Sequence, residues 1–315
     1  MVKQPIAVVG GGAWGTGLAA AAARKYADVL LVSRRDVEVT IPGVRVTQDL
    51  TMATSQARTI VLAVPSQVAL EFTRVLREVV TPEHIVIHSG RGLVGDDLET
   101  MSEVIARETP ARFLGVIGGP ALASDLLSGE PSVVVCGAND DIVGRSFIDA
   151  FMTPEVRVYT TSDLRGVEWG AALVGCIAII VGYGQQMGLS PGSLAAGITR
   201  SMHEAALLTA AAGGSERTLF GLAGFGDLLA AISQRKRPEV QLGMRLARGL
   251  PIEEAIHQVR HRVEGATLIP RISAWAAARR IRVPIFDAMA TGAFTGRPPE
   301  DVVHELMTLP VEDPG

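Results

Sequence analysis

The feature that most constrains the fold is a glycine-rich turn between a short apolar run and an alanine-rich run. Ile6–Val9 is typical of a buried parallel strand, because four apolar residues follow one another without alternation. Gly10, Gly12 and Gly15 come next at the G-x-G-x-x-G spacing. These glycines permit a tight turn, the approach of a pyrophosphate and close packing of a helix on a strand. The spacing alone is weak evidence. With a strand before it and a helix and a second strand after it, it favours a dinucleotide site over a ligand-free turn.

The end of the second strand bears on which dinucleotide binds. Val29–Val32 runs into Ser33, Arg34 and Arg35, and no acidic residue appears before Asp36. A site selective for NAD places Asp or Glu at this point, where the carboxylate binds the ribose 2′-hydroxyl. A hydroxyl and two guanidinium groups suit a 2′-phosphate instead. We therefore predict NADP(H), with NAD(H) left open. The alternative is a pair of solvated surface arginines.

Composition limits the class of protein. The chain has 315 residues, 48% of them hydrophobic and 20% charged, which fits a globular protein of two domains. The formal net charge of −4 argues against nucleic-acid binding. Two distant cysteines, Cys136 and Cys176, provide neither a metal site nor a disulfide framework. The first residues run directly into a strand without a leader pattern, and the apolar run 170–182 is shorter than a bilayer requires. We expect a cytoplasmic protein without membrane, metal or nucleic-acid partners.

Strands and helices alternate over residues 1–160, which predicts an α/β domain with a doubly wound parallel sheet. Small and turn-forming residues follow the middle strands, and ligands bind outside the carboxyl ends of strands in such sheets. The strand pattern stops near residue 160, and residues 161–315 read as helices. We therefore predict a dinucleotide-binding domain, 1–160, and a helical substrate domain, 161–315. The strands predicted after the second are Thr59–Val64, His84–His88, Phe113–Ile117, Ser132–Cys136 and Val156–Tyr159.

Eight short motifs are spread over nearly the whole chain, at 10–16, 63–66, 90–93, 119–123, 166–173, 198–200, 221–228 and 263–265. With these motifs the chain resembles the NAD(P)-dependent glycerol-3-phosphate dehydrogenases. The tryptophan in the glycine loop and the Gly-Leu-Ala-Gly-x-Gly-Asp block are the most specific of them. The resemblance implies a Rossmann-type domain followed by a helical domain, hydride transfer on a nicotinamide, and no metal.

On the cofactor side this chain keeps the residues of the family pattern. It implies that the glycine loop binds the pyrophosphate, that the arginines after the second strand reach the 2′-phosphate, and that Glu264 contacts the cofactor. The predicted cofactor-binding residues are Gly10, Gly12, Ala13, Trp14, Gly15, Ser33, Arg34, Arg35, Pro65, Arg91, Ala123 and Glu264.

On the substrate side the family pattern is broken. The family's general acid/base is a Lys after Gly-Ala-Leu, where this chain has Val174, and Gly175 stands at the adjoining Asn. Arg91, just after the predicted strand His84–His88, stands where the family has a Lys. Carbonyl reduction needs a proton in the transition state, which valine cannot give. Of the family's polar substrate set, Asp227 remains. The other departures are Ala121 for Ser, Ala231 for Thr, and Arg237-Pro238-Glu239 for Ser-Arg-Asn.

Three residues are candidates for a replacement catalytic site. Arg91 keeps a positive charge, and its guanidinium can donate two hydrogen bonds to an oxyanion. The alternative is that Arg91 is a surface arginine. Asp227 can orient a substrate group, although a structural hydrogen bond explains it nearly as well. His203 is a possible proton donor, but a lone helical His is more often structural. For His88, at the end of a strand, the same two roles, catalytic and structural, are open. The basic run 234–237 is a solvated loop or a second anion site.

Three functions remain open from the sequence. The first is an NADP(H)-dependent oxidoreductase on this scaffold with a changed small carbonyl or imine substrate, since a cationic imine does not need the missing Lys. The second is the family's own reaction, dihydroxyacetone phosphate to glycerol 3-phosphate, in a rearranged site. The third is a non-catalytic dinucleotide-binding sensor or partner subunit. A homodimer is possible, because long apolar helices can bury an interface as well as a core.

Overall fold

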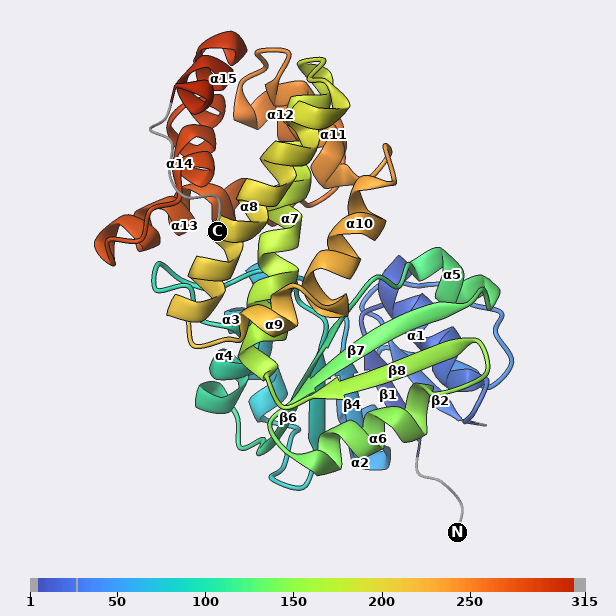
Figure 1. The fold of residues 1–315 in the computed structure, drawn as a ribbon. Helices are drawn as coiled ribbons and strands as arrows, with labels where there is room; N and C mark the ends of the chain where they lie inside the picture. Colours follow the sequence, from blue (N-terminus) through green and yellow to red (C-terminus); the bar gives the residue numbers. More distant parts are fainter. Residues whose placement is uncertain (1–4, 27, 309–315) are drawn as a thin grey trace.

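The computed structural model describes residues 5–26 and 28–308. The expectation that the chain carries no leader pattern rests mostly on residues before the first strand that lie outside this description. An eight-stranded sheet forms the base of the described chain, and a group of helices stands on it (Figure 1). The strands are β1 (Ile6–Val9), β2 (Val29–Val32), β3 (Val44–Thr47), β4 (Thr59–Leu62), β5 (Ile85–His88), β6 (Phe113–Gly118), β7 (Ser132–Ala138) and β8 (Val156–Thr161).

The strand order is β3-β2-β1-β4-β5-β6-β7-β8. The first six strands follow the doubly wound dinucleotide-binding order and pair in parallel. The predicted fold class is therefore confirmed, with two corrections. β7 pairs antiparallel to β6, so the sheet is mixed. β3, a half-exposed edge strand, was missing from the prediction because its sequence alternates polar and apolar residues and lacks an apolar run.

Helices cover both faces of the sheet. Side chains of Ile6 and Val8 join one apolar core, and those of Ala7 and Val9 join the other, because successive residues of a strand point to opposite faces. The first core holds α1 and α6, with α5 beside α1, and the second holds α2, α3 and α4. These elements are α1 (Ala13–Ala23), α2 (Leu50–Gln56), η1 (Ser66–Val68), α3 (Ala69–Arg77), α4 (Met101–Glu108), α5 (Ala123–Ser128) and α6 (Asp141–Phe151).

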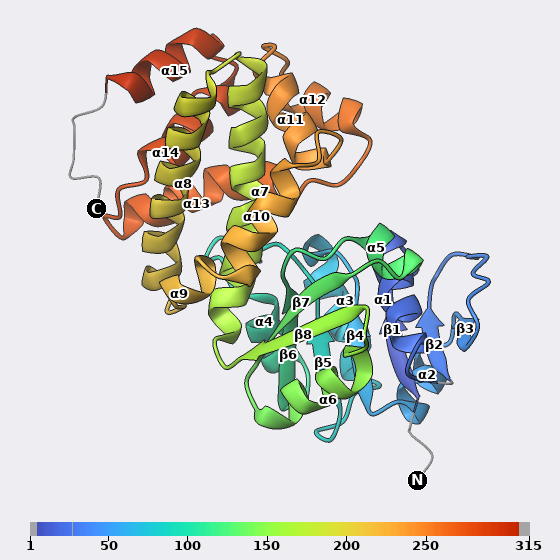
Figure 2. The ribbon, with the colours of Figure 1, turned by 45° about the vertical axis from the view of Figure 1, so that its right-hand side comes forward.

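After β8 the described chain is helical up to residue 308. α7 rises from the sheet through the middle of the other helices (Figure 2). Within this part, residues 222–232 form a π-turn followed by a short helix. The elements are α7 (Leu164–Gln186), α8 (Pro191–Ala211), α9 (Glu216–Leu219), η2 (Leu222–Gly226), α10 (Asp227–Ile232), α11 (Pro238–Leu246), α12 (Ile252–Val259), α13 (Gly265–Ala278), α14 (Pro284–Thr291), η3 (Ala293–Thr295) and α15 (Pro299–Met307).

α7 is the core of the helical part. At 23 residues it is long and apolar enough to cross a membrane, unlike the shorter run considered in the sequence, but 83% of its most apolar window is buried inside the protein. It packs most closely on α11. A Cβ on Gly182 would overlap the Val240 carbonyl, and one on Gly243 would overlap that of Ile179. These two glycines let the backbones of α7 and α11 touch toward the C-terminal end of α7.

Candidate cofactor and substrate cleft

The glycine loop leaves an anion site at the start of α1. Gly12 is the N-cap in extended conformation, and no side chain caps the helix. The first amide N–H groups of α1 are therefore available to an anion. A Cβ on Gly12 would meet no atom within 4 Å, whereas one on Gly15 would overlap the Gly10 carbonyl. Gly15 is thus required for packing, and Gly12 for leaving space that a pyrophosphate can use.

The end of β2 presents positive charge beside this loop. Arg34 and Arg35 are exposed, and no ion pair or hydrogen bond of their side chains occurs within the described chain. Ser33 is buried, and its hydroxyl donates to the Arg35 carbonyl at 2.8 Å. Asp36 accepts a hydrogen bond from Gln48 at 2.9 Å, so its carboxylate is already engaged. The arrangement favours a 2′-phosphate over a 2′-hydroxyl.

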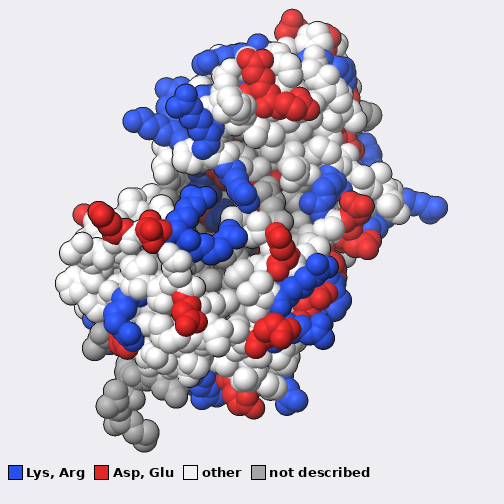
Figure 3. Space-filling model, turned by 180° about the vertical axis from the view of Figure 1, so that it is seen from behind, with Lys and Arg blue, Asp and Glu red and all other residues white. Residues whose placement is uncertain are grey.

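A cleft of about 330 Å³ lies where the loops at the carboxyl ends of β1, β4 and β5 face α7, α11 and the start of α13. This is near the small end of the roughly 300–1,000 Å³ found for ligand pockets. The surface is hollowed between the two parts of the molecule, with Lys and Arg side chains at its rim (Figure 3). The cleft is lined by Trp14, Ala63, Val64, Pro65, Ser89, Gly90, Arg91, Gly175, Glu239, Arg262, Glu264 and Gly265.

Arg91 and Asp227 meet at this cleft. The Arg91 Nη2 donates to Asp227 Oδ2 at 2.6 Å, and the Asp227 side chain is 3% exposed. Burial opposes the charge of Arg91, but Asp227, and then Glu239 and Glu264, outweigh it and raise the pKa of the guanidinium. The Arg91 Nε is buried without a partner in the described chain. Two of the three predicted catalytic residues are therefore brought together.

A buried network holds the loop that carries Arg91. His88 Nε2 lies 2.9 Å from Glu168 Oε1, and the Gly90 amide donates to His88 Nδ1 at 3.2 Å. Glu168 also accepts from the amide of Ser102 at 2.8 Å and from its hydroxyl at 2.6 Å. Because Nδ1 accepts, the His88 proton belongs on Nε2, facing the carboxylate. His88 thus fixes the backbone just before Arg91 and is enclosed away from the cleft.

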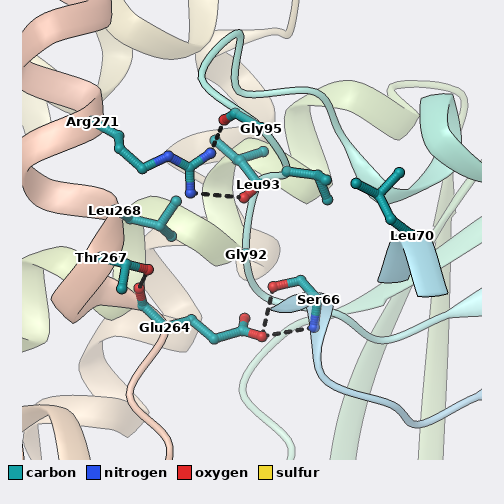
Figure 4. Close-up of a pocket in the computed structure, with 10 residues that line it drawn as sticks. Ser66, Leu70, Gly92, Leu93, Gly95, Glu264, Thr267, Leu268 and Arg271 are labelled. Carbon is teal, nitrogen blue, oxygen red and sulfur yellow. Dashed lines mark hydrogen bonds between the residues drawn. The ribbon is translucent and has the colours of Figure 1, made fainter. Parts of the chain in front are cut away.

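Glu264 stands between this cleft and a second cavity of about 250 Å³. Its Oε1 accepts from the amide of Ser66 at 2.8 Å and from the hydroxyl at 2.6 Å (Figure 4). Its Oε2 is buried and has no partner in the described chain. Gly92 leaves room for this contact, since a Cβ there would crowd both Ser66 and Glu264. Glu264 is therefore held in place with one acceptor oxygen left over.

The residues that replace the family's substrate groups lie on α7 and at the start of α11. Val174 is fully buried in the apolar core of the helical part. Gly175 lines the cleft, and a Cβ there would meet nothing within 4 Å. Arg237 Nε donates to Glu239 Oε2 at 3.1 Å, and the Glu239 side chain is 17% exposed. The start of α11 therefore presents a carboxylate to the cleft.

The remaining predicted residues lie in several places. Trp14 and Pro65 line the cleft, and Ala13 opens α1. Ala123 opens α5, beside Gly17 of α1. His203 is exposed on α8 and is not among the lining residues. No group of three or more His, Cys, Asp or Glu that could hold a metal occurs in the part of the chain described.

Sequence reasoning missed some residues of the site. Arg262 lines the cleft, and its place two residues before Glu264 was a usable signal. Ser66 and Glu168 were not predicted to act, because their partners come from 198 and 66 residues away in the chain.

These features fit a nicotinamide dinucleotide. The uncapped start of α1 and the open space at Gly12 suit the pyrophosphate, and the arginines after β2 suit the 2′-phosphate. Glu264, the residue expected to contact the cofactor, lines the cleft. When bound, the nicotinamide ring supplies or accepts a hydride.

Comparisons with known proteins agree with this geometry. Models of the NAD-dependent glycerol-3-phosphate dehydrogenase N-terminus and C-terminus match residues 38–143 and 163–304. A glycerol-3-phosphate dehydrogenase (NAD(P)+) of Oleidesulfovibrio alaskensis is 32% identical, over 98% of this chain and 99% of the relative. One of Moorella thermoacetica is 33% identical, over 98% and 97%. The crystal structure of glycerol-3-phosphate dehydrogenase from Coxiella burnetii superposes with a TM-score of 0.90 at 26% identity, covering 98% of this chain and 100% of that one. The chain therefore belongs to the NAD-dependent glycerol-3-phosphate dehydrogenase family and is an NAD(P)-dependent oxidoreductase.

Proposed function

We propose that this enzyme transfers a hydride between NADPH and a small carbonyl or imine substrate other than dihydroxyacetone phosphate. The observation that carries the proposal is the absence of a proton donor of the family type. Val174 stands at the position of the family's Lys and is fully buried among apolar side chains. The cleft is lined by no Lys, His, Cys or Tyr among the described residues. The two arginines that line it keep their protons and cannot act as acids.

The start of α11 gives independent support. At the positions of the family's Ser-Arg-Asn, which hold the substrate phosphate, Pro238 has no side-chain donor and the Arg237 guanidinium is paired with Glu239. The Glu239 carboxylate faces the cleft, where it would repel a phosphate dianion. Loss of one such stabilising group typically lowers kcat by about 10²-fold or more. Loss of several should abolish the parent reaction.

One observation favours the family's own reaction as a second candidate. Arg91 and Arg262 both line the cleft, so positive charge remains near the place where a phosphorylated substrate would bind. This candidate still needs a proton donor, and it must overcome the charge of Glu239. A non-catalytic dinucleotide sensor, the third possibility, predicts NADPH binding without turnover of any small substrate.

The test is NADPH consumption with dihydroxyacetone phosphate, with NADPH binding followed by fluorescence. We expect the wild-type protein to bind NADPH and leave dihydroxyacetone phosphate unreacted. The triple variant Val174→Lys, Pro238→Arg, Glu239→Asn restores the family residues. It should gain turnover of about 10²-fold or more over background. Val174→Leu is the matched control and should gain none. Turnover of dihydroxyacetone phosphate by the wild type would refute the proposal.

A further inference from the structure

We propose that the cleft selects a zwitterionic substrate, an imine protonated on nitrogen that also carries a carboxylate. In this arrangement Glu239 binds the cationic nitrogen and Arg91 binds the carboxylate. The inference rests on the proposed function, because it names the class of substrate that the altered cleft accepts.

Glu239 supplies the negative side of this recognition. Close packing of α7 on α11 places it in the wall of the cleft, which Gly175 of α7 also lines. Its Oε2 accepts from Arg237 at 3.1 Å, while its Oε1 has no hydrogen-bond partner in the described chain. The side chain is 17% exposed, so a ligand N–H that reaches Oε1 would be largely removed from water. A charge-assisted hydrogen bond is strongest under those conditions.

Arg91 supplies the positive side. Its Nη2 is engaged by Asp227, while its Nη1 has no hydrogen-bond partner in the described chain and belongs to a side chain that is 31% exposed and lines the cleft. A carboxylate oxygen of a ligand can accept a charge-assisted hydrogen bond from this group. Arg262, exposed at the rim, adds a second positive charge.

The negative charge of Glu239 and the positive charges of Arg91 and Arg262 together select the ligand. A purely anionic ligand would be repelled by Glu239, and a purely cationic one by Arg91 and Arg262. A molecule with a cationic nitrogen and a carboxylate complements both sides. The open space at Gly175 leaves room for a small ring beside Glu239, and Val174 adds no polar group nearby.

The reaction of such a substrate is balanced without a protein acid. Hydride adds to the carbon of the C=N bond, and the π electrons of that bond become the nitrogen lone pair. The iminium becomes a neutral amine, which then takes a proton from water. A ketone would instead leave an alkoxide that needs a proton in the transition state.

Binding of the reaction product tests the inference directly. Isothermal titration of the NADP+-saturated protein would compare three ring compounds of similar size. Piperidine-2-carboxylate carries both charges, piperidine only the positive one, and cyclohexanecarboxylate only the negative one. We expect each singly charged compound to bind about tenfold more weakly, or worse, than the zwitterion. Equal binding of the zwitterion and either analogue, or no binding of the zwitterion, would overturn the inference.

Variants assign the roles. Glu239→Gln should weaken binding of the zwitterion about tenfold and strengthen binding of cyclohexanecarboxylate, because it removes the repelling charge. Glu239→Asp should retain part of the difference between the two compounds. Glu253→Gln changes an exposed acid in the first turn of α12 and serves as the matched control. In turnover assays, 1-piperideine-2-carboxylate should be reduced and 2-oxobutanoate should not. Reduction of the oxo acid alone refutes this inference but leaves the proposed function standing, whereas reduction of dihydroxyacetone phosphate refutes the proposed function.

Discussion

Glu204 makes the stability of the helical part depend on pH. Its carboxylate lies on α8, is 3% exposed, and accepts hydrogen bonds from the amides of Ile285 and Phe286 at 2.9–3.1 Å. These amides open α14, whose own N-cap residue, Val283, offers no side-chain acceptor. Glu204 therefore caps a helix 80 residues further along the chain. Burial raises its pKa to about 7 although the two amides act in the opposite direction, and Asp287 adds to the rise.

The shift sets the size and sign of the effect. The ordinary value is 4.5, and each pKa unit corresponds to about 1.4 kcal/mol, so ionising Glu204 in the folded protein costs roughly 3 kcal/mol more than in the unfolded chain. Between about pH 4.5 and 7 the folded state binds more protons than the unfolded state. The contribution of Glu204 to the free energy of unfolding therefore falls as pH rises through this window and is constant above it.

Urea unfolding of the wild type and Glu204→Gln at several pH values measures this contribution. Fluorescence of Trp169 and Trp275, whose rings lie 5.0 Å apart in the helical core, reports on the relevant part. The free energy of unfolding of the wild type relative to the variant should fall by roughly 3 kcal/mol from pH 4.5 to pH 8. The exposed Glu216→Gln is the control and should show no such trend. A difference that does not change with pH would refute the reasoning.

Two further predictions concern cofactor binding. Gly12→Ala should leave the urea midpoint nearly unchanged but weaken NADPH binding about tenfold or more, because its Cβ would occupy only the space left for the pyrophosphate. Gly15→Ala should lower the midpoint as well, since its Cβ would overlap the Gly10 carbonyl, and equal midpoints for the two variants would contradict this account. Arg34→Ala and Arg35→Ala should raise the Kd for NADPH about tenfold and leave that for NADH within about twofold, measured by fluorescence titration. Equal losses for both cofactors would show that the arginines do not read the 2′-phosphate.

The fold was largely predictable from the sequence because its main signals are local. A parallel sheet is predicted without any knowledge of contacts by the apolar runs of β1, β2, β4 and β5 and by the glycine turn after β1. The antiparallel pairing of β7 was not predictable in this way. A buried strand has the same apolar composition in either direction, and its direction depends on the path of the connection.

The site was predictable only in part, for the same reason. Arg91 and Asp227 were both candidates, but no local pattern indicates that residues 136 positions apart form an ion pair. In the sequence Glu239 is only a departure from the family pattern, and its free oxygen at the cleft wall is seen only with α11 packed on α7. Arg262 lies in a basic stretch of the sequence, and only its position in the wall of the cleft indicates a role for it.

The sequence divides near residue 160, where the strand pattern stops, but buried contacts join the two parts of the structure. Glu168, at the base of α7, is the acceptor for buried donors of His88 and Ser102. One apolar cluster also joins Val116 and Val135 of the sheet to Val167 and Ala223 of the helical part. A fragment cut after β8 would keep those donors and valines and lose these partners from α7 and η2. We therefore expect such a fragment to be less stable than the same residues in the whole chain, because it would expose buried apolar surface and leave those buried donors without this acceptor.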